Sequence, residues 1–242
     1  MESVAITDVG ERREVNQDFV YCNDNSVGIL PNLYIVADGM GGHKAGDFAS
    51  RFCVGEFEKE IKNMTGRTII GSIESAIRHT NEELLKVAVT NPDYEGMGTT
   101  FVAATVTERA VFIANIGDSR MYLLSKNGNL LQITEDHSLV EEMIRDGKLD
   151  PKEAKHHPKK NVITRALGAA EHVVPDFFEI EAEEGDYLLI CSDGLTNMVE
   201  DEAIRSIILQ SEQTLAERAK SLIDAANEQG GKDNISVILI KR

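Results

Sequence analysis

Three apolar runs in the sequence each reach an aspartate, and a fourth run begins at one. LYIVADG reaches Asp38, VFIANIGDS reaches Asp118, YLLICSDG reaches Asp193, and DNISVILIK begins at Asp233. Asp18 stands in the same way before FVYC. Because Asp favours turns and helix N-caps, any one of these positions alone is explained by a local turn. Five such positions together favour a shared edge of the fold where carboxylates meet.

Carboxylates gathered at one edge need a positive partner, because close negative charges repel by several kcal/mol when nothing neutralises them. In antiparallel pairing the start of one strand lies beside the end of the next, so Asp18 and Asp233 can join the other three. Ligand sets made only of oxygen select hard cations such as Mg²⁺, Mn²⁺ or Ca²⁺ over zinc. The sequence therefore predicts a divalent-cation site.

The glycine-rich stretch VADGMGGHKAG lacks the features of a nucleotide-binding loop. Its GMG would open a GxGxxG fingerprint, but Lys44 stands at the sixth position, and no GxxxxGK[ST] phosphate loop occurs. The chain also has no EF-hand loop, GxSxG elbow or HExxH pair. The chemistry is therefore assigned to Asp38, and we interpret Gly41 and Gly42 as clearance for the contents of a cleft.

The elements that must position these acids follow from local composition. Ten short segments rich in Val, Ile, Phe and Tyr are predicted to be strands: Val4–Ile6, Phe19–Cys22, Leu33–Ala37, Thr100–Val106, Val111–Ile116, Met121–Ser125, Leu130–Ile133, Phe177–Glu181, Tyr187–Cys191 and Ile235–Ile240. Helical spacing of apolar residues predicts helices near 48–62, 68–89, 201–210 and 214–228. Strands and helices do not alternate regularly, which favours an α+β fold with segregated helices over mostly antiparallel sheets.

Composition narrows the function further. The net charge is −16, from 41 acids against 25 bases, which argues against a nucleic-acid partner. No apolar run approaches the roughly 18 residues of a membrane span, and the N-terminus does not resemble a secretory signal, so a cytoplasmic location without membrane attachment is expected. The three cysteines form no CxxC pair, so neither a zinc site nor a disulfide framework is indicated. One domain spanning 1–242 is expected.

Eight segments in order carry a family resemblance. They are TDVGERREVNQD at 7–18, VADGMGGHKAG at 36–46, GMGTT at 96–100, NIGDSR at 115–120, ITEDHS at 133–138, ITRALG at 163–168, CSDGLTNMV at 191–199 and GGKDNISVILI at 230–240. With these segments the sequence resembles the metal-dependent serine/threonine protein phosphatases of type 2C, in particular compact bacterial members, over essentially all of its length. The resemblance implies a four-layer αββα sandwich, monomeric, with a small flap at about 137–165.

The resemblance also implies roles at the core metal pair. Asp38 resembles the carboxylate that bridges two Mn²⁺ or Mg²⁺ ions, and Gly39 the residue that offers a backbone carbonyl to one of them. Asp193 and Asp233 resemble the remaining direct ligands, and Asp18 an acid that holds one ion partly through water. The acids expected from strand ends are thus the same residues that the resemblance marks.

Beyond the core pair, Asp118 resembles an acid that helps to hold a third ion in bacterial members. Arg13 matches the arginine that grips the substrate phosphate; its spacing from Asp18 favours it over Arg12, which is interpreted as a solvated surface charge. Many eukaryotic relatives carry a histidine where this chain has Met40. The sequence leaves His43 as a weaker candidate for the acid that protonates the leaving group, with a metal-bound water favoured.

The expected activity is hydrolysis of phosphoserine and phosphothreonine in proteins phosphorylated by a partner serine/threonine kinase. A water held between the two ions, ionised to hydroxide, would attack phosphorus directly, so no phosphoenzyme is needed. Three alternatives stay open: a catalytically inactive binding module of the same fold, a dedicated phosphatase of stress or sporulation regulators, and a plain cation-binding protein. The lysines within 148–160 could steer an anionic phosphopeptide or simply form a solvated loop.

Overall fold

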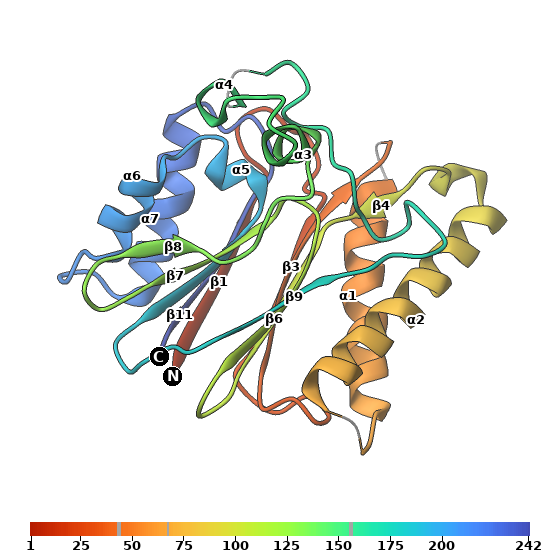
Figure 1. Cartoon of the computed structure of the whole chain (residues 1–242), viewed down its shortest axis with the longest axis horizontal. Coiled ribbons are helices and arrows are strands. Elements are labelled where there is room, and N and C mark those ends of the chain that lie inside the picture. Colours follow the sequence, from red (N-terminus) through yellow and green to blue (C-terminus); the bar gives the residue numbers. More distant parts are fainter. Residues whose placement is uncertain (43–44, 67, 155–156) are drawn as a thin grey trace.

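Two β-sheets packed face to face form the centre of the molecule (Figure 1). The computed structural model describes residues 1–42, 45–66, 68–154 and 157–242. The first sheet has the order β1 (Glu2–Asp8), β11 (Ile235–Lys241), β10 (Tyr187–Cys191), β7 (Arg120–Leu124) and β8 (Leu130–Gln132). The second has the order β2 (Asp18–Asn23), β3 (Leu33–Met40), β5 (Phe101–Val106), β6 (Val111–Ile116) and β9 (Asp176–Ile180), with β4 (Gly98–Thr99) beside β3. Neighbouring strands are antiparallel.

Helices cover the outer face of each sheet (Figure 1). The second sheet carries α1 (Ala45–Asn63) and α2 (Ile69–Thr90), and the first carries α6 (Asp201–Ile208) and α7 (Leu215–Glu228). The start of α2 is set by Thr68, whose side chain accepts the N–H of Gly71, and that of α7 by a capping box between Thr214 and Glu217. The predicted α+β fold with four layers is therefore confirmed.

The layer between the sheets is apolar because alternate residues of the central strands point into it. Val36 and Ile113 of the second sheet share one buried cluster with Ile190 and Ile238 of the first. Burying side chains of this kind contributes about 1.5–3 kcal/mol each relative to leaving them exposed. The packed double sheet holds the strand ends in place, and with them the side chains at the strand ends.

The flap segment, residues 137–165, lies at one end of the two sheets and contains α3 (Leu139–Arg145) and α4 (Pro151–Ala154) (Figure 1). Two further short elements, η1 (Pro92–Tyr94) and α5 (Asp193–Thr196), were not expected from the sequence. A single helical turn such as α5 is too short to show apolar periodicity. No helix within the described part of the chain is both long and apolar enough to cross a membrane.

Candidate active site

Antiparallel pairing brings the strand-end aspartates to one edge. Asp18 opens β2 and lies directly opposite Asp38, which stands two residues before the end of β3. Asp118 lies in the turn between β6 and β7, Asp193 opens α5 directly after β10, and Asp233 stands just before β11. Since β10 pairs with β11, the last two acids enter the same region. The grouping expected from the sequence is therefore present.

The pKa values of four of these acids show how closely the five gather. Burial raises the pKa of Asp38 well above its ordinary value, and four neighbouring negative charges raise it further: those of Asp18, Asp193, Asp118 and Asp233. Burial likewise raises the pKa of Asp18 to about 7, of Asp118 to about 8 and of Asp193 to about 6. Without a cation, the folded protein therefore favours protonating these acids.

The chemistry of the acid cluster, meaning these five aspartates, fits a hard divalent cation. Asp18, Asp118 and Asp193 each have one buried carboxylate oxygen with no hydrogen-bond partner. Across the described residues, no three acidic, histidine or cysteine side chains enclose one ion by themselves. Water molecules and a backbone carbonyl would complete the coordination, which suits Mg²⁺ and Mn²⁺ because Mg²⁺ usually keeps several waters.

Gly39 follows the central aspartate and lies where no side chain fits. Its N–H donates to the carbonyl of Gln17 at 3.1 Å, and a Cβ at this position would stand 2.0 Å from the carbonyl oxygen of Gly46. At Gly42, by contrast, a Cβ would have open space around it. Close backbone packing therefore explains why residue 39 is a glycine, which the sequence alone could not explain. His43 lies outside the described residues.

Thr100, between β4 and β5, holds the backbone of Asp38 in place. The N–H of Asp38 donates to Thr100 Oγ1 at 2.9 Å, and the N–H of Thr100 donates to the Asp38 carbonyl at 2.8 Å. Thr100 Oγ1 also lies 2.8 Å from Ser119 Oγ, beside Asp118. One buried hydroxyl thus links the segments that carry two of the acids. The motif GMGTT contains this residue, but nothing in its spacing reveals the link.

Replacing Thr100 with Val should weaken Mn²⁺ binding by about tenfold, because supporting groups around metal ligands typically have effects of roughly 10–100-fold. The Asp38 N–H would lose its acceptor while the side-chain volume stays nearly constant. Isothermal titration with Mn²⁺ measures the change. Thr105→Val is the matched control: Thr105 is equally buried, but its hydroxyl donates to Asn32, away from the acid cluster. Equal Mn²⁺ affinities in both variants would contradict the positioning role.

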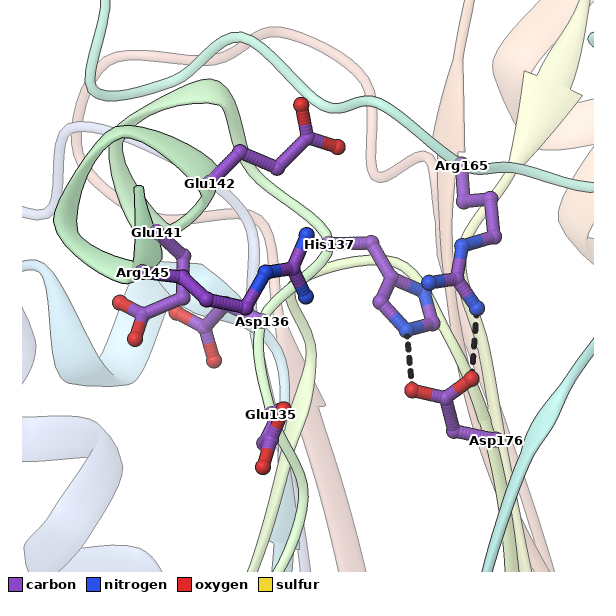
Figure 2. A pocket seen from close by; sticks show the side chains of 8 residues that line it. All are labelled: Glu135, Asp136, His137, Glu141, Glu142, Arg145, Arg165 and Asp176. Atoms are coloured by element: carbon purple, nitrogen blue, oxygen red, sulfur yellow. Dashed lines mark hydrogen bonds and ion pairs between the residues drawn. The ribbon is translucent and has the colours of Figure 1, made fainter. Parts of the chain in front are cut away.

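His137 holds the turn that precedes Asp118 on one side and meets Asp176 on the other, and Figure 2 shows the contact with Asp176. The N–H of Gly117 donates to His137 Nδ1 and the N–H of His137 donates to the Gly117 carbonyl, both at 3.0 Å. Since Nδ1 accepts, the ring proton resides on Nε2, which donates to Asp176 at 3.1 Å. Arg165 donates to the other oxygen of Asp176 at 2.6 Å. Burial lowers the pKa of His137, so the ring stays neutral near pH 7.

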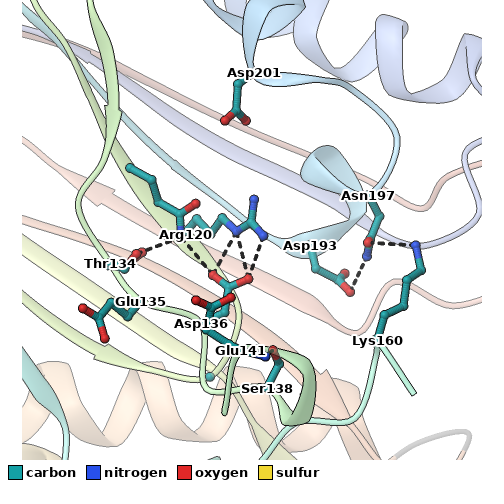
Figure 3. Close-up of polar contacts among 12 residues, drawn as sticks. Arg120, Thr134, Glu135, Asp136, Ser138, Glu141, Lys160, Asp193, Asn197 and Asp201 are labelled. Carbon is teal, nitrogen blue, oxygen red and sulfur yellow. Dashed lines mark hydrogen bonds and ion pairs between the residues drawn. The ribbon is translucent and has the colours of Figure 1, made fainter. Parts of the chain in front are cut away.

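Arg120 lies beside the acid cluster with its charge paired to that of Asp136 (Figure 3). Its guanidinium holds both oxygens of Asp136, with the shortest contact 2.7 Å, and Nη1 donates to Tyr122 at 3.0 Å. Burial raises the pKa values of Asp118 and Asp193, and the charge of Arg120 acts against that rise. This bidentate pair was not predicted, because the two residues lie on different elements.

Arg13 lies at the outer side of the cluster. Its Nη2 donates to Asp233 at 2.7 Å, and its side chain is 47% exposed. Arg12 is exposed and makes no ion pair or hydrogen bond through its side chain with any described residue. Of the two adjacent arginines, the one chosen from the sequence is therefore the one that reaches the acids.

Comparisons with known proteins agree with this geometry. The family model described as Protein phosphatase 2C matches residues 10–237. The serine/threonine phosphatase stp of Listeria monocytogenes is 45% identical over 229 residues, covering 91% of this chain and 90% of that protein. The solved serine/threonine phosphatase of S. agalactiae superposes with a TM-score of 0.91 at 38% identity, covering 98% of each chain.

One further solved structure bears on the metal. The catalytic domain of the serine/threonine protein phosphatase PstP, in complex with two manganese ions, matches with a TM-score of 0.85 at 35% identity, covering 98% of this chain and 96% of that one. The matched residues 10–237 include the whole acid cluster and Arg13. The chain therefore belongs to the protein phosphatase 2C family.

Proposed function

We propose that this chain is a metal-dependent protein serine/threonine phosphatase whose reaction centre is the acid cluster. The observation that carries the proposal is the set of unpartnered, buried carboxylate oxygens around Asp38, with Arg13 at the outer side. Asp38 and Asp18, with Asp193, Asp233 and the Gly39 carbonyl, would hold a core pair of Mn²⁺ or Mg²⁺ ions. Asp118 would help to hold a third.

The protein's own residues would bind the substrate and hold the segments that carry the acids in place. The ions, when bound, supply Lewis-acid activation of water and offset the negative charge of the phosphate. Arg13 can present two parallel N–H groups to phosphate oxygens, which is the geometry that guanidinium groups favour. Thr100 and His137 hold the backbone segments that carry Asp38 and Asp118. No cysteine is needed as a nucleophile, and Cys53 and Cys191 are buried.

Hydrolysis assays test the proposed function directly. p-Nitrophenyl phosphate and a phosphothreonine peptide should both be hydrolysed with Mn²⁺, and activity should vanish on chelation and return when Mn²⁺ is added back. Activity that survives complete chelation would contradict metal dependence. Inactivity towards both substrates with Mn²⁺ or Mg²⁺ would contradict the phosphatase assignment and favour a binding module.

Arg13→Ala should lower kcat/KM by at least about a hundredfold, since each hydrogen bond to a charged group contributes about 1.5–3 kcal/mol and two would be lost. The substrate's phosphate would then be bound without its guanidinium partner. Arg12→Ala serves as the control, because it removes the same charge one residue away. Steady-state kinetics with p-nitrophenyl phosphate compare the two variants, and similar losses in both would argue for a general charge effect instead.

The cellular setting of the activity is part of the same proposal. The substrates would be phosphoproteins produced by a serine/threonine kinase, and the chain would act in the cytoplasm as one monomeric catalytic domain comprising residues 1–242. The net charge of −16 supports the absence of a nucleic-acid partner. Of the flap lysines proposed to steer substrate, Lys155 lies outside the described residues and Lys159 is exposed.

A further inference from the structure

A cleft of about 370 Å³ extends from the acid cluster beneath the flap segment. We call it the flap cleft. Its inner end is formed by Asp118 and Asp193, and its walls come from α3, the 160–161 stretch, α5 and the start of α6. Figure 3 shows Glu141, Lys160 and Asp201 around it, each from a different element. The cleft is thus a built space that joins the reaction centre to the surface.

The inner end of the flap cleft is shared with the proposed reaction centre. Asp118 is 6% exposed, lines the cleft and has a carboxylate oxygen without a hydrogen-bond partner. A phosphate group bound at the acid cluster would therefore place the residues that flank it in the peptide at the mouth of this cleft. The side chains along the cleft then decide which flanking residues are accepted.

Two cations line the flap cleft among the described residues, and each already has a protein partner. Arg120 is bound by both oxygens of Asp136, so that pair contributes little net charge. Lys160 Nζ donates to Asn197 Oδ1 at 3.4 Å, and Asn197 in turn donates to Asp193 at 2.8 Å. Lys160 therefore lies towards the Asp193 side of the cleft.

Acidic side chains also line the flap cleft. Glu141 on α3 and Asp201 at the start of α6 line the flap cleft together with Glu200. Glu141 is exposed and has no side-chain ion pair with a described residue. Among the described residues, the Asp201 carboxylate accepts only from the Tyr122 hydroxyl, at 3.3 Å. Burial, followed by the charge of Asp136, raises the pKa of Glu141, so an arriving cation would relieve an unfavourable field.

The flap cleft also offers apolar surface. Val140 and Val199, which are 8% and 5% exposed, line it beneath the acids. Lys and Arg side chains combine a long aliphatic stem with a charged end, so they can cover apolar surface while their charge meets a carboxylate. A wall of this composition suits a basic side chain better than an acidic or a short polar one.

We propose that the flap cleft is a specificity subsite that accepts a Lys or Arg side chain next to the phosphorylated residue, through Glu141 and Asp201. This proposal rests on the proposed phosphatase function. It assigns to the site a substrate class, namely phosphopeptides with a basic residue close to the phosphoserine or phosphothreonine. The recognition would rest on charge complementarity across the cleft.

Matched phosphothreonine peptides test the subsite in the Mn²⁺-loaded full chain. Arg or Glu is placed in turn at each of the three positions on either side of the phosphothreonine, and kcat/KM is measured for each peptide. The wild-type protein should prefer the best Arg peptide over its Glu counterpart by about tenfold, since exposed charge pairs contribute about 0.2–1 kcal/mol each and the Glu peptide adds repulsion. Higher salt should reduce the ratio.

Single and double variants test whether the preference for Arg peptides arises from Glu141 and Asp201. Glu141→Gln should reduce the Arg/Glu ratio to about threefold, and addition of Asp201→Asn should bring it close to unity. Glu142→Gln is the matched control: it removes the same charge from the same helix, but Glu142 lines only the adjoining pocket beside His137, whereas Glu141 lines both that pocket and the flap cleft (Figure 2). Because each variant is judged by its own ratio, differences in overall rate or folded fraction cancel. Glu141→Gln alone carries the test if the double variant does not fold.

Any of three results would contradict the proposed subsite. These outcomes are a ratio near unity in the wild-type protein, a ratio unchanged in Glu141→Gln, or an equal change in Glu142→Gln. If Glu141→Gln shifts the Mn²⁺ dependence of p-nitrophenyl phosphate hydrolysis and leaves the peptide ratio unchanged, the carboxylate serves cation binding instead. Failure of the wild-type protein to hydrolyse p-nitrophenyl phosphate would count against the proposed function, which separates the two failures.

Discussion

Asp38→Asn is expected to lower kcat/KM for phosphate-ester hydrolysis by on the order of a thousandfold, while making the metal-free protein harder to unfold. Asp38 is at the centre of the acid cluster, where four other carboxylates raise its pKa. An amide keeps the shape but loses the charge needed to hold cations. The same loss removes repulsion from the metal-free site, so activity and stability should move in opposite directions.

Two measurements check this result together: steady-state kinetics with p-nitrophenyl phosphate, and thermal unfolding in chelator. Asp47→Asn is the control, because Asp47 lies on α1 and pairs with Arg51 on the same helix. That variant should keep its activity and gain no stability. An Asp38→Asn protein with normal kinetics would show that the central carboxylate is not part of the reaction centre. Loss of activity together with lower stability would indicate disrupted folding instead.

The second large effect concerns thermal stability: bound metal should reverse the direction in which it changes with pH. In the metal-free protein, thermal stability should fall by on the order of 5 °C between about pH 6.5 and about pH 8.5. Folding raises the pKa of Asp18 from 3.8 to about 7 and of Asp118 from 3.8 to about 8, so the folded state binds more protons than the unfolded state between the ordinary and the raised values. The stability gained from those protons is lost as pH rises and the acids ionise. The neutral His137 does not contribute in this window, since burial lowers its pKa.

With saturating Mn²⁺ the trend should reverse, because cations compete with protons for the same oxygens and bind best when the acids are ionised. Differential scanning calorimetry across this pH range, with chelator and then with Mn²⁺, measures both slopes. Asp38→Asn should flatten the metal-free slope, since fewer interacting acids remain. Parallel slopes with and without Mn²⁺ would show that these aspartates are not where the metal binds.

The main elements and the acid cluster were predictable because their causes are local. Asp38, Asp193 and Asp233 each adjoin an apolar run, and antiparallel pairing of neighbouring strands then places such positions at one edge. A single Asp at a strand end indicates only a turn. Several such positions in one sequence indicate a shared site. The resemblance to a known family added roles for residues that the strand pattern had already selected.

The supporting interactions were not predictable, because they join residues far apart in sequence through tertiary packing. Thr100 meets Ser119, and His137 meets Asp176, only after β5, β6 and β9 have aligned. A buried threonine hydroxyl has no sequence signature that separates it from an ordinary strand residue. The same holds for Glu141: its relevance to the flap cleft depends on which face of the short helix α3 points towards α6, and seven residues show too little periodicity to decide this.

The contact between Arg13 and Asp233 has a thermodynamic consequence. While the two side chains neutralise each other, the guanidinium is engaged by a carboxylate that a cation would also claim. If Asp233 holds a cation as proposed, that cation would weaken the engagement and free the guanidinium for an anionic ester; conversely, an ester that drew Arg13 away would leave Asp233 freer for the cation. Reciprocity of binding free energies requires the two effects to be equal. On the proposed assignment, cation and phosphate ester would therefore bind cooperatively, and inorganic phosphate released by the reaction would help to retain the ions between turnovers.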